Sequence, residues 1–205
     1  MIKLNKIPIF PIMVYEIDVP QEIYLPLLQW APSLDYHWGD TNARKFTDVF
    51  GQPEAEPVCN WINETIVEIY NDLFTNPFAY QMEVCAMWMN KAERGDYTHE
   101  HIHPWSVISG IIYLAGSGGR TVFSRKNPYD NIMGMPISDR FMNREAYTPT
   151  PGKMILFPSN LEHSVEINDE DTTRYTLSFN TFPGVVNKDP TVHLDKCPYQ
   201  PKPRP

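Results

Sequence analysis

The sequence predicts a mainly β protein, a double-stranded β-helix of the jelly-roll type packed on one or two α-helices. Helical periodicity is confined to the N-terminal part, and short strand-like segments separated by turns follow it. The 20 prolines among 205 residues disfavour long helices and central strands. We expect one domain, 1–205, with an edge strand and supporting helices over 1–78, the β-helix core over 79–182 and a Pro-rich tail over 183–205.

The composition is that of a globular protein, with 42% hydrophobic and 20% charged residues. The net charge of -8 and the lack of a basic run argue against a nucleic-acid surface. No apolar stretch is long enough to span a membrane, and the N-terminus lacks the features of a signal peptide. Cys59, Cys85 and Cys197 are odd in number and far apart, which is typical of reduced thiols in a cytoplasmic protein. The sequence predicts no particular oligomeric state.

The N-terminal part predicts an edge strand and two helices. Segment 7–19 is β-like but contains Pro8 and Pro11, which suits an edge strand. A short helix is expected over 21–31, and the clearest helix over 57–74. The second helix has an apolar stripe, which requires a sheet to pack against. The stripe consists of Val58, Trp61, Ile62, Ile66, Ile69, Tyr70 and Leu73.

Strand-like segments dominate the rest of the chain. The Gly95–Asp96 pair marks a turn, and Gly116–Gly119 predicts a hairpin turn between the strands on either side of it. The last two strands are expected to pair with each other across an acidic turn at 168–171. In order, the expected strands are 80–89, the histidine-rich segment 99–103, 107–114, 120–124, 154–157, 163–167 and 174–182.

A segment without periodicity lies in the second half of the chain. Loop 126–146 is long for a compact domain, and such loops are often lids over a binding site. An ordered insertion packed by its own methionines is an equally good interpretation. Its apolar residues are Tyr129, Met133, Met135 and Phe141.

Four of the six histidines occur in two places. Because alternate side chains of a strand share one face, His99, His101 and His103 can line one side together. With His163 on a partner strand, they could hold a divalent transition metal and leave positions open. Arg174 follows nearby, and a fixed cation beside a metal suggests an anionic co-substrate.

The strand that begins at Arg174 has two contrasting faces. One face is apolar, and the other is a row of hydrogen-bonding groups, which is costly inside a barrel unless something satisfies it. A solvent-facing polar side of a sheet is the alternative. Tyr113 is a phenol donor that could receive a carboxylate beside an arginine, although alone it would be a core aromatic. The polar row is Arg174, Thr176, Ser178 and Asn180, and the apolar row is Tyr175, Leu177 and Phe179.

The order of these fragments resembles the iron(II)- and 2-oxoglutarate-dependent dioxygenases. The similarity is greatest to the prolyl-hydroxylase-like branch, and within it to a small group common in bacteria and phages. Each fragment is weak alone, but their order and spacing together are specific over 80–182. The fragments are His101–Ser106, Ser109–Leu114, Pro151–Ser159, His163 and Arg174–Asn180.

The resemblance implies a double-stranded β-helix with Fe(II) in its mouth, held by His101, His103 and His163. The family's second ligand is usually Asp or Glu, whereas this chain has His103 at that position. A neutral imidazole there leaves the centre one charge more positive, which puts the native metal in question. A shifted register that uses His99 with His101 remains an alternative, and otherwise His99 would lie outside the ligand set.

The resemblance also implies a co-substrate site and a reaction. Arg174 would bind the C5 carboxylate of 2-oxoglutarate, helped by Tyr113 and Thr176. The reaction would use O2 to hydroxylate an unknown substrate, peptide (prolyl) or small molecule, and would release succinate and CO2. The protein's own share is to position the reactants, so no protein acid or base is nominated.

Two other functions fit the histidines. A cupin-like three-histidine metalloenzyme that does not use 2-oxoglutarate would share the fold, but would not need Arg174 and Tyr113 to face the metal. A non-catalytic jelly-roll module would hold a structural metal in a closed shell of four ligands, or no metal.

Overall fold

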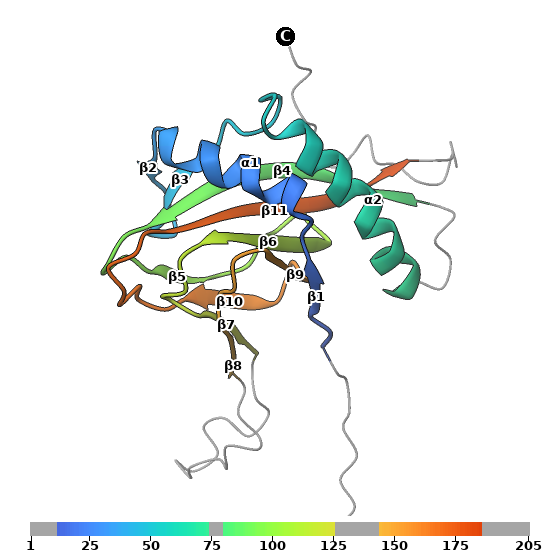
Figure 1. Ribbon diagram of the computed structural model, residues 1–205. Coiled ribbons are helices and arrows are strands. Elements are labelled where there is room, and N and C mark those ends of the chain that lie inside the picture. The colour runs from blue at the N-terminus through green and yellow to red at the C-terminus, as the bar shows by residue number, and fades with distance from the viewer. Residues whose placement is uncertain (1–11, 74–79, 126–143, 186–205) are drawn as a thin grey trace, which may run out of the picture.

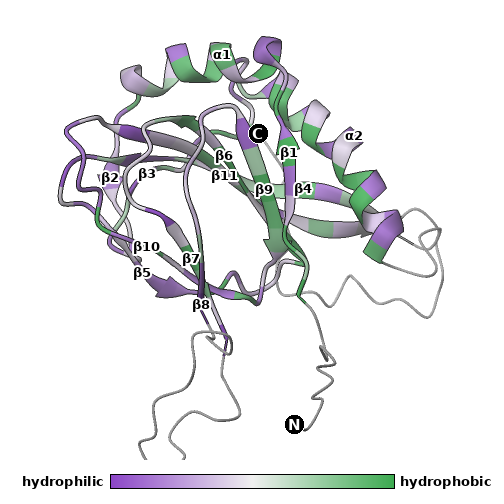
Figure 2. Ribbon diagram, turned by 60° about the horizontal axis from the view of Figure 1, so that its bottom comes forward, coloured by the Kyte–Doolittle hydropathy of each residue, from purple (hydrophilic) through white to green (hydrophobic). Residues whose placement is uncertain are grey.

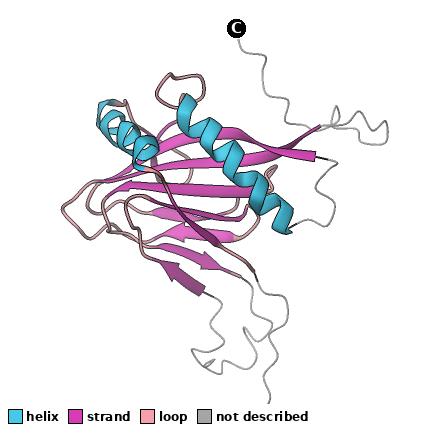
Figure 3. Ribbon diagram, turned by 45° about the vertical axis from the view of Figure 1, so that its right-hand side comes forward, coloured by secondary structure: helices cyan, strands magenta, loops and turns pink. Residues whose placement is uncertain are grey.

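The computed structural model describes residues 12–73, 80–125 and 144–185. Two β-sheets face each other, and both helices lie on the outer side of the larger one (Figures 1 and 3). The larger sheet has the strand order β1-β9-β6-β11-β4-β3-β2, and the smaller sheet β5-β10-β7-β8. This arrangement confirms the predicted jelly-roll fold with flanking helices.

The elements have the following bounds. The helices are α1 (Gln21–Trp30), the 3-10 turn η1 (Ala31–Ser33) and α2 (Glu56–Leu73). The strands of the larger sheet are β1 (Tyr15–Asp18), β2 (His37–Trp38), β3 (Arg44–Phe46), β4 (Tyr80–Ala92), β6 (Ile108–Ala115), β9 (Lys153–Pro158) and β11 (Arg174–Val185). Those of the smaller sheet are β5 (Thr98–His101), β7 (Thr121–Ser124), β8 (Arg144–Tyr147) and β10 (Glu162–Val165).

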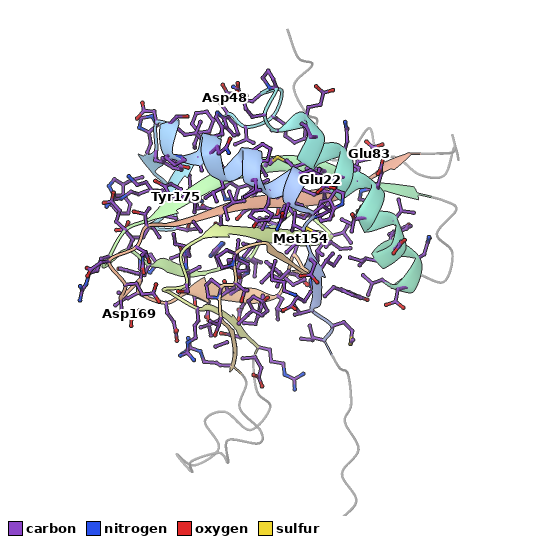
Figure 4. All side chains as sticks on the ribbon, viewed as in Figure 1. Glu22, Asp48, Glu83, Met154, Asp169 and Tyr175 are labelled. Atoms are coloured by element: carbon purple, nitrogen blue, oxygen red, sulfur yellow. The ribbon has the colours of Figure 1, made fainter. Side chains whose placement is uncertain are left out.

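Both predicted helices are confirmed, and they cover the outer face of the larger sheet. The apolar stripe of α2 faces the sheet, with Ile62 and Ile66 fully buried, while its polar residues face outward (Figure 2). Met154 of β9, labelled in Figure 4, and Leu177 of β11 belong to the same apolar layer. The helices therefore leave the opposite face of the larger sheet for the cavity between the sheets.

The alternation predicted for β11 is also confirmed. Leu177 and Phe179 are buried in the layer beneath the helices, whereas Arg174, Thr176 and Ser178 line the cavity between the sheets. Phe179 lies directly opposite Gly110 of β6, and a Cβ at Gly110 would be 2.1 Å from the ring's Cζ. A glycine at this position lets the ring lie flat across the neighbouring strand.

Two predicted strand pairings are wrong. Gly116–Gly119 does not close a hairpin, because β6 lies in the larger sheet and β7 in the smaller one. Likewise β10 pairs with β5 and β7, and β11 pairs with β4 and β6. In a jelly roll, successive strands cross between sheets, and the residues of a turn do not reveal which connection they form.

Other expectations lie partly or wholly outside the described residues. The edge position of the first strand is confirmed, since β1 ends the larger sheet and, among the described strands, pairs only with β9. Most of loop 126–146 is not described, although its last residues begin β8. The Pro-rich tail is likewise not described beyond residue 185. In the described ranges, no helix combines the length and apolarity needed to cross a membrane.

Candidate metal centre

Three histidines meet in the cavity between the sheets. His163 is on β10, His101 is its direct partner at the end of β5, and His103 follows two residues later. One nitrogen from each imidazole lies within 4.8 Å of the others. The structure thus brings together the three histidines that the resemblance implies as ligands.

Backbone carbonyls orient two of these rings. The Nδ1 atom of His101 lies 2.7 Å from the carbonyl oxygen of His99, and that of His163 lies 2.9 Å from the oxygen of Leu161. Because a carbonyl only accepts hydrogen bonds, each Nδ1 carries the proton. The lone pair is then on Nε2, which is the arrangement that a metal-binding imidazole needs.

A hydroxyl and amide network holds the third ring. The Nδ1 atom of His103 lies 2.8 Å from the Oγ of Ser109, which is fully buried. The same Oγ lies 2.8 Å from the Oγ of Ser159 and 2.7 Å from the Oδ1 of Asn180. This network joins β6 and β11, so both strands fix the orientation of His103.

The three imidazoles are neutral near pH 7. Burial, together with the neighbouring His101, lowers the pKa of His163 to about 3 and that of His103 to about 4. Burial also lowers the pKa of His101. Neutral imidazoles are the form that binds a metal ion, so no proton has to be displaced at neutral pH.

His99 lies apart from this cluster. Between the pairs His163–His101 and Val165–Thr98, β10 advances by two residues and β5 by three, which is a β-bulge. The extra residue breaks the alternation, so Thr98 lines the cavity and His99 lines a groove on the outer face of the smaller sheet. The sequence allowed either His101 with His103 or His99 with His101 beside His163. The structure brings the His101 and His103 rings together with His163, and the His99 ring is not in that cluster.

Arg174 and Tyr113 line the same cavity as the histidines. Arg174 is 6% exposed, and its Nη1 donates to the carbonyl oxygens of Gly118 and Gly119. No carboxylate of the described residues forms an ion pair with it. The charge of Asp96 acts on Arg174 from beyond ion-pair distance. A buried guanidinium without a carboxylate in direct contact is costly, and a ligand carboxylate would reduce that cost.

The Tyr113 hydroxyl is also deeply buried. It lies 2.8 Å from the Oγ1 of Thr121, and burial raises the pKa of Tyr113, so the phenol keeps its proton. A protonated phenol beside a guanidinium is a second hydrogen-bond donor for an anion. Thr176, the third predicted co-substrate residue, is paired in register with Tyr113 and lines the same cavity.

Sequence reasoning missed several cavity residues. The Nδ2 of Asn90 donates to the hydroxyls of Thr176 and Ser178 at 3.2 and 2.9 Å. The Trp88 ring packs edge-on against the His103 ring, with 5.4 Å between the ring centroids. Lys45 of β3 also lines the cavity. Asn90 directly follows the apolar run that ends at Met89, which is a usable signal, but nothing in the sequence near Lys45 indicates a site.

The donor set fits Fe(II) and 2-oxoglutarate. Three imidazole nitrogens suit Fe(II) or zinc and leave coordination positions for other molecules. The guanidinium of Arg174, which forms no ion pair with the described residues, suits a carboxylate, with the donors of Tyr113 and Thr176 nearby. Within the described part of the chain, no fourth residue joins the metal-binding cluster, as a closed structural site would require.

Comparison with known proteins agrees with this chemistry. Residues 86–180 match the model of a family described as "Putative 2OG-Fe(II) oxygenase". The matched segment contains the three clustered histidines, Tyr113 and Arg174. A search of curated proteins found no match.

Solved structures share the fold at low sequence identity. A Pseudomonas putida prolyl-4-hydroxylase is 13% identical, with a TM-score of 0.59 over 82% of this chain and 91% of that chain. HygX from Streptomyces hygroscopicus, solved with nickel, 2-oxoglutarate and hygromycin B, is 10% identical, with a TM-score of 0.61 over 84% and 83%. A 2OG-Fe(II) oxygenase family oxidoreductase from Burkholderia pseudomallei is 14% identical, with a TM-score of 0.57 over 77% and 76%.

Over residues 86–180 the chain is thus similar to the iron(II)- and 2-oxoglutarate-dependent oxygenases, and the solved structures share its fold. The resemblance found in the sequence is confirmed, and with it the enzyme class and its cofactors, Fe(II) and 2-oxoglutarate. Its particular substrate is a separate question.

Proposed function

We propose that this protein hydroxylates an organic substrate with His101, His103 and His163 as the iron ligands and Arg174 as the co-substrate anchor. One observation carries the proposal. Three imidazoles with Nδ1 engaged and Nε2 available share a cavity with a buried guanidinium that has no carboxylate partner among the described residues.

Arg174 would bind the C5 carboxylate of 2-oxoglutarate. Its Nη1 is engaged by two glycine carbonyls, which hold the guanidinium in place and leave Nε and Nη2 for the ligand. Tyr113 and Thr176 would add donors from the neighbouring strand and from β11 itself. Asn90 holds the Thr176 hydroxyl, so that the side chain keeps a single orientation.

When bound, Fe(II) and 2-oxoglutarate supply O2 activation, coupled to oxidative decarboxylation of the co-substrate to succinate and CO2. The residues of the chain bind and orient the reactants and keep water out of a cavity whose walls are largely buried. His103 stands where the family usually has a carboxylate, so the ligand set carries no negative charge. The dianionic co-substrate would offset the charge of the metal.

The substrate would be a peptide, such as a prolyl peptide, or a small molecule. Both classes occur among the similar structures: one is a prolyl hydroxylase from Trichoplax adhaerens in complex with a peptide fragment, and HygX holds hygromycin B. The net charge of -8 disfavours nucleic acid as a substrate. A cytoplasmic enzyme without membrane attachment fits the same composition.

The cupin-like alternative is less well supported. A three-histidine enzyme that does not use 2-oxoglutarate has no need for a buried arginine and tyrosine in its metal cavity. Arg174 and Tyr113 both line that cavity, and this favours the 2-oxoglutarate-dependent reaction.

The proposal is tested by anaerobic addition of Fe(II) and 2-oxoglutarate to the purified protein. We expect a visible metal-to-ligand charge-transfer band, and a loss of 2-oxoglutarate affinity of about tenfold or more in Arg174→Ala. The matched control is Arg120→Ala, whose guanidinium is at the surface in an ion pair with Glu166. A wild-type protein that forms no band, or an Arg174→Ala variant that binds 2-oxoglutarate like Arg120→Ala, would contradict the proposal.

A further inference from the structure

We propose that Lys45 recognises a carboxylate of the primary substrate, so that the protein acts on an organic acid or on an acidic group of a larger molecule. This inference rests on the proposed function, because it assigns the substrate side of the same cavity.

Lys45 belongs to a row of side chains that crosses four strands. In register, Lys45 of β3 lies opposite Asn90 of β4, Asn90 opposite Thr176 of β11, and Thr176 opposite Tyr113 of β6. Directly opposed residues of neighbouring strands point to the same face of a sheet. All four line the cavity with the histidines, so Lys45 ends the row on the side away from Tyr113.

The positive charge of the cavity favours the binding of a second anion beside 2-oxoglutarate. Among the described residues that line it, Lys45 and Arg174 are the cations, and none is Asp or Glu. With His103 in place of a carboxylate ligand, the iron, Arg174 and Lys45 carry four positive charges, against two negative charges on 2-oxoglutarate and one on Asp40, the exposed ion-pair partner of Lys45. Excess charge in a buried site is costly, and an anionic substrate would reduce it.

The Lys45 side chain is positioned for the cavity but only weakly held by protein. Its aliphatic stem crosses Gly39, where a Cβ would lie 3.0 Å from Cδ, and its side chain is 20% exposed. Its ion-pair partner is Asp40, with Nζ 3.1 Å from Oδ1, and the Asp40 side chain is 88% exposed. Such exposed pairs contribute little, so a substrate carboxylate can replace Asp40.

Lys45 is separate from the co-substrate anchor. It lies two strands away from Arg174, which corresponds to roughly 10 Å between backbones. The two carboxylates of 2-oxoglutarate would be taken up by Arg174 and by the metal, which leaves Lys45 for another ligand. Thr41 supports this assignment, because its Oγ1 is buried at the cavity and has no hydrogen-bond partner in the described part of the chain.

Backbone hydrogen bonds fix the loop that precedes Lys45. The backbone oxygen of Thr41 accepts a hydrogen bond from the amide of His99 at 3.0 Å, and the Gly39 amide donates to the Ala43 oxygen at 2.8 Å. These bonds tie the loop to β5 and to itself. The part of the cavity lining that contains Thr41 and Lys45 is therefore preorganised before substrate binds.

The test uses simple acids as probes on the full-length protein loaded anaerobically with Fe(II) and saturating 2-oxoglutarate. Acetate, propionate and benzoate are titrated calorimetrically beside acetamide, propionamide and benzamide. We expect the wild type to prefer each acid over its amide, and Lys45→Met to reduce acid affinity by about tenfold. Lys45→Arg should retain the preference, and Asp40→Asn should strengthen acid binding because the competing carboxylate is gone.

Lys91→Met is the matched control. Lys91 is the neighbour of Asn90 on β4, forms an ion pair with Glu93 and does not line the cavity. Its removal should leave acid affinity unchanged. The affinity for 2-oxoglutarate, measured from the charge-transfer band, should change far less in Lys45→Met than in Arg174→Ala.

Three results would overturn the inference. They are equal binding of acids and amides by the wild type, equal acid binding by Lys45→Met and Lys91→Met, and a loss of 2-oxoglutarate affinity in Lys45→Met as large as in Arg174→Ala. Failure of the proposed function is distinct, because it would appear as no 2-oxoglutarate binding by the wild type. The acid titrations on the metal-loaded protein alone would then decide the role of Lys45.

Discussion

The hydrogen bond between Ser109 and His103 offers a direct test of how the metal centre is held. Ser109 is fully buried, and its Oγ contacts His103 Nδ1, Ser159 Oγ and Asn180 Oδ1 at 2.7 to 2.8 Å. Ser109→Ala removes all three contacts at once and adds no atoms. The variant therefore leaves buried polar groups without their partner while keeping the shape of the site.

The magnitude follows from those contacts. A buried polar group that loses its partner costs about 1–3 kcal/mol, so the metal-free variant should lose about that much unfolding free energy. Removal of a group that orients a metal-binding histidine lowers metal affinity by about 10- to 100-fold, or roughly 1.4–2.8 kcal/mol. The two effects are separable, because only the second requires His103 to bind metal.

Metal affinity is measured by anaerobic competition between the protein and a chelator for Fe(II), and stability by urea unfolding of the metal-free protein. The matched control is Ser164→Ala, a neighbour of His163 on β10 that lines the outer groove instead of the cavity. If Ser109→Ala lost stability but bound Fe(II) as tightly as Ser164→Ala, then His103 would not be a metal ligand and the reasoning would fail.

Two further predictions concern Gly110 and His99. Gly110→Ala should destabilise the protein by about 1–3 kcal/mol in urea unfolding, because the new Cβ would overlap the Phe179 ring. Phe179→Leu in the same chain should recover part of that loss, and a fully additive double variant would disprove the clash. His99→Ala should leave Fe(II) affinity close to wild type, whereas His101→Ala should weaken it by about tenfold or more. Equal losses in both variants would show that the His99 ring binds the metal.

Predictions of which side chains face the cavity were most accurate where a strand is regular. The alternation of β11 separated the cavity residues from the apolar ones correctly, because consecutive residues from Arg174 to Phe179 follow the strand period. The same rule failed at His99, because β5 contains a bulge. A bulge depends on the partner strand, so the local sequence contains little sign of it.

The pairing of strands and the composition of the cavity wall were harder to predict. Gly116–Gly119 has the residues of a hairpin turn, yet it connects two sheets, and Arg174 donates to its carbonyls. Lys45, Asn90 and Ser109 come from three separate strands of the larger sheet and become neighbours of the histidines only after folding. Such groupings depend on register across a sheet, which periodicity within one segment does not determine.

The place of β11 in the larger sheet has a consequence for biosynthesis. It is the last described strand in the chain, yet it lies between β4 and β6, pairing with β4 along its whole length and with β6 over Tyr175–Asn180. A nascent polypeptide that has not reached Arg174 therefore exposes two unpaired edges that would otherwise face β11. Ribosomes that stall before this point would release fragments prone to aggregate, and the cavity between the sheets forms only after β11 has been synthesised.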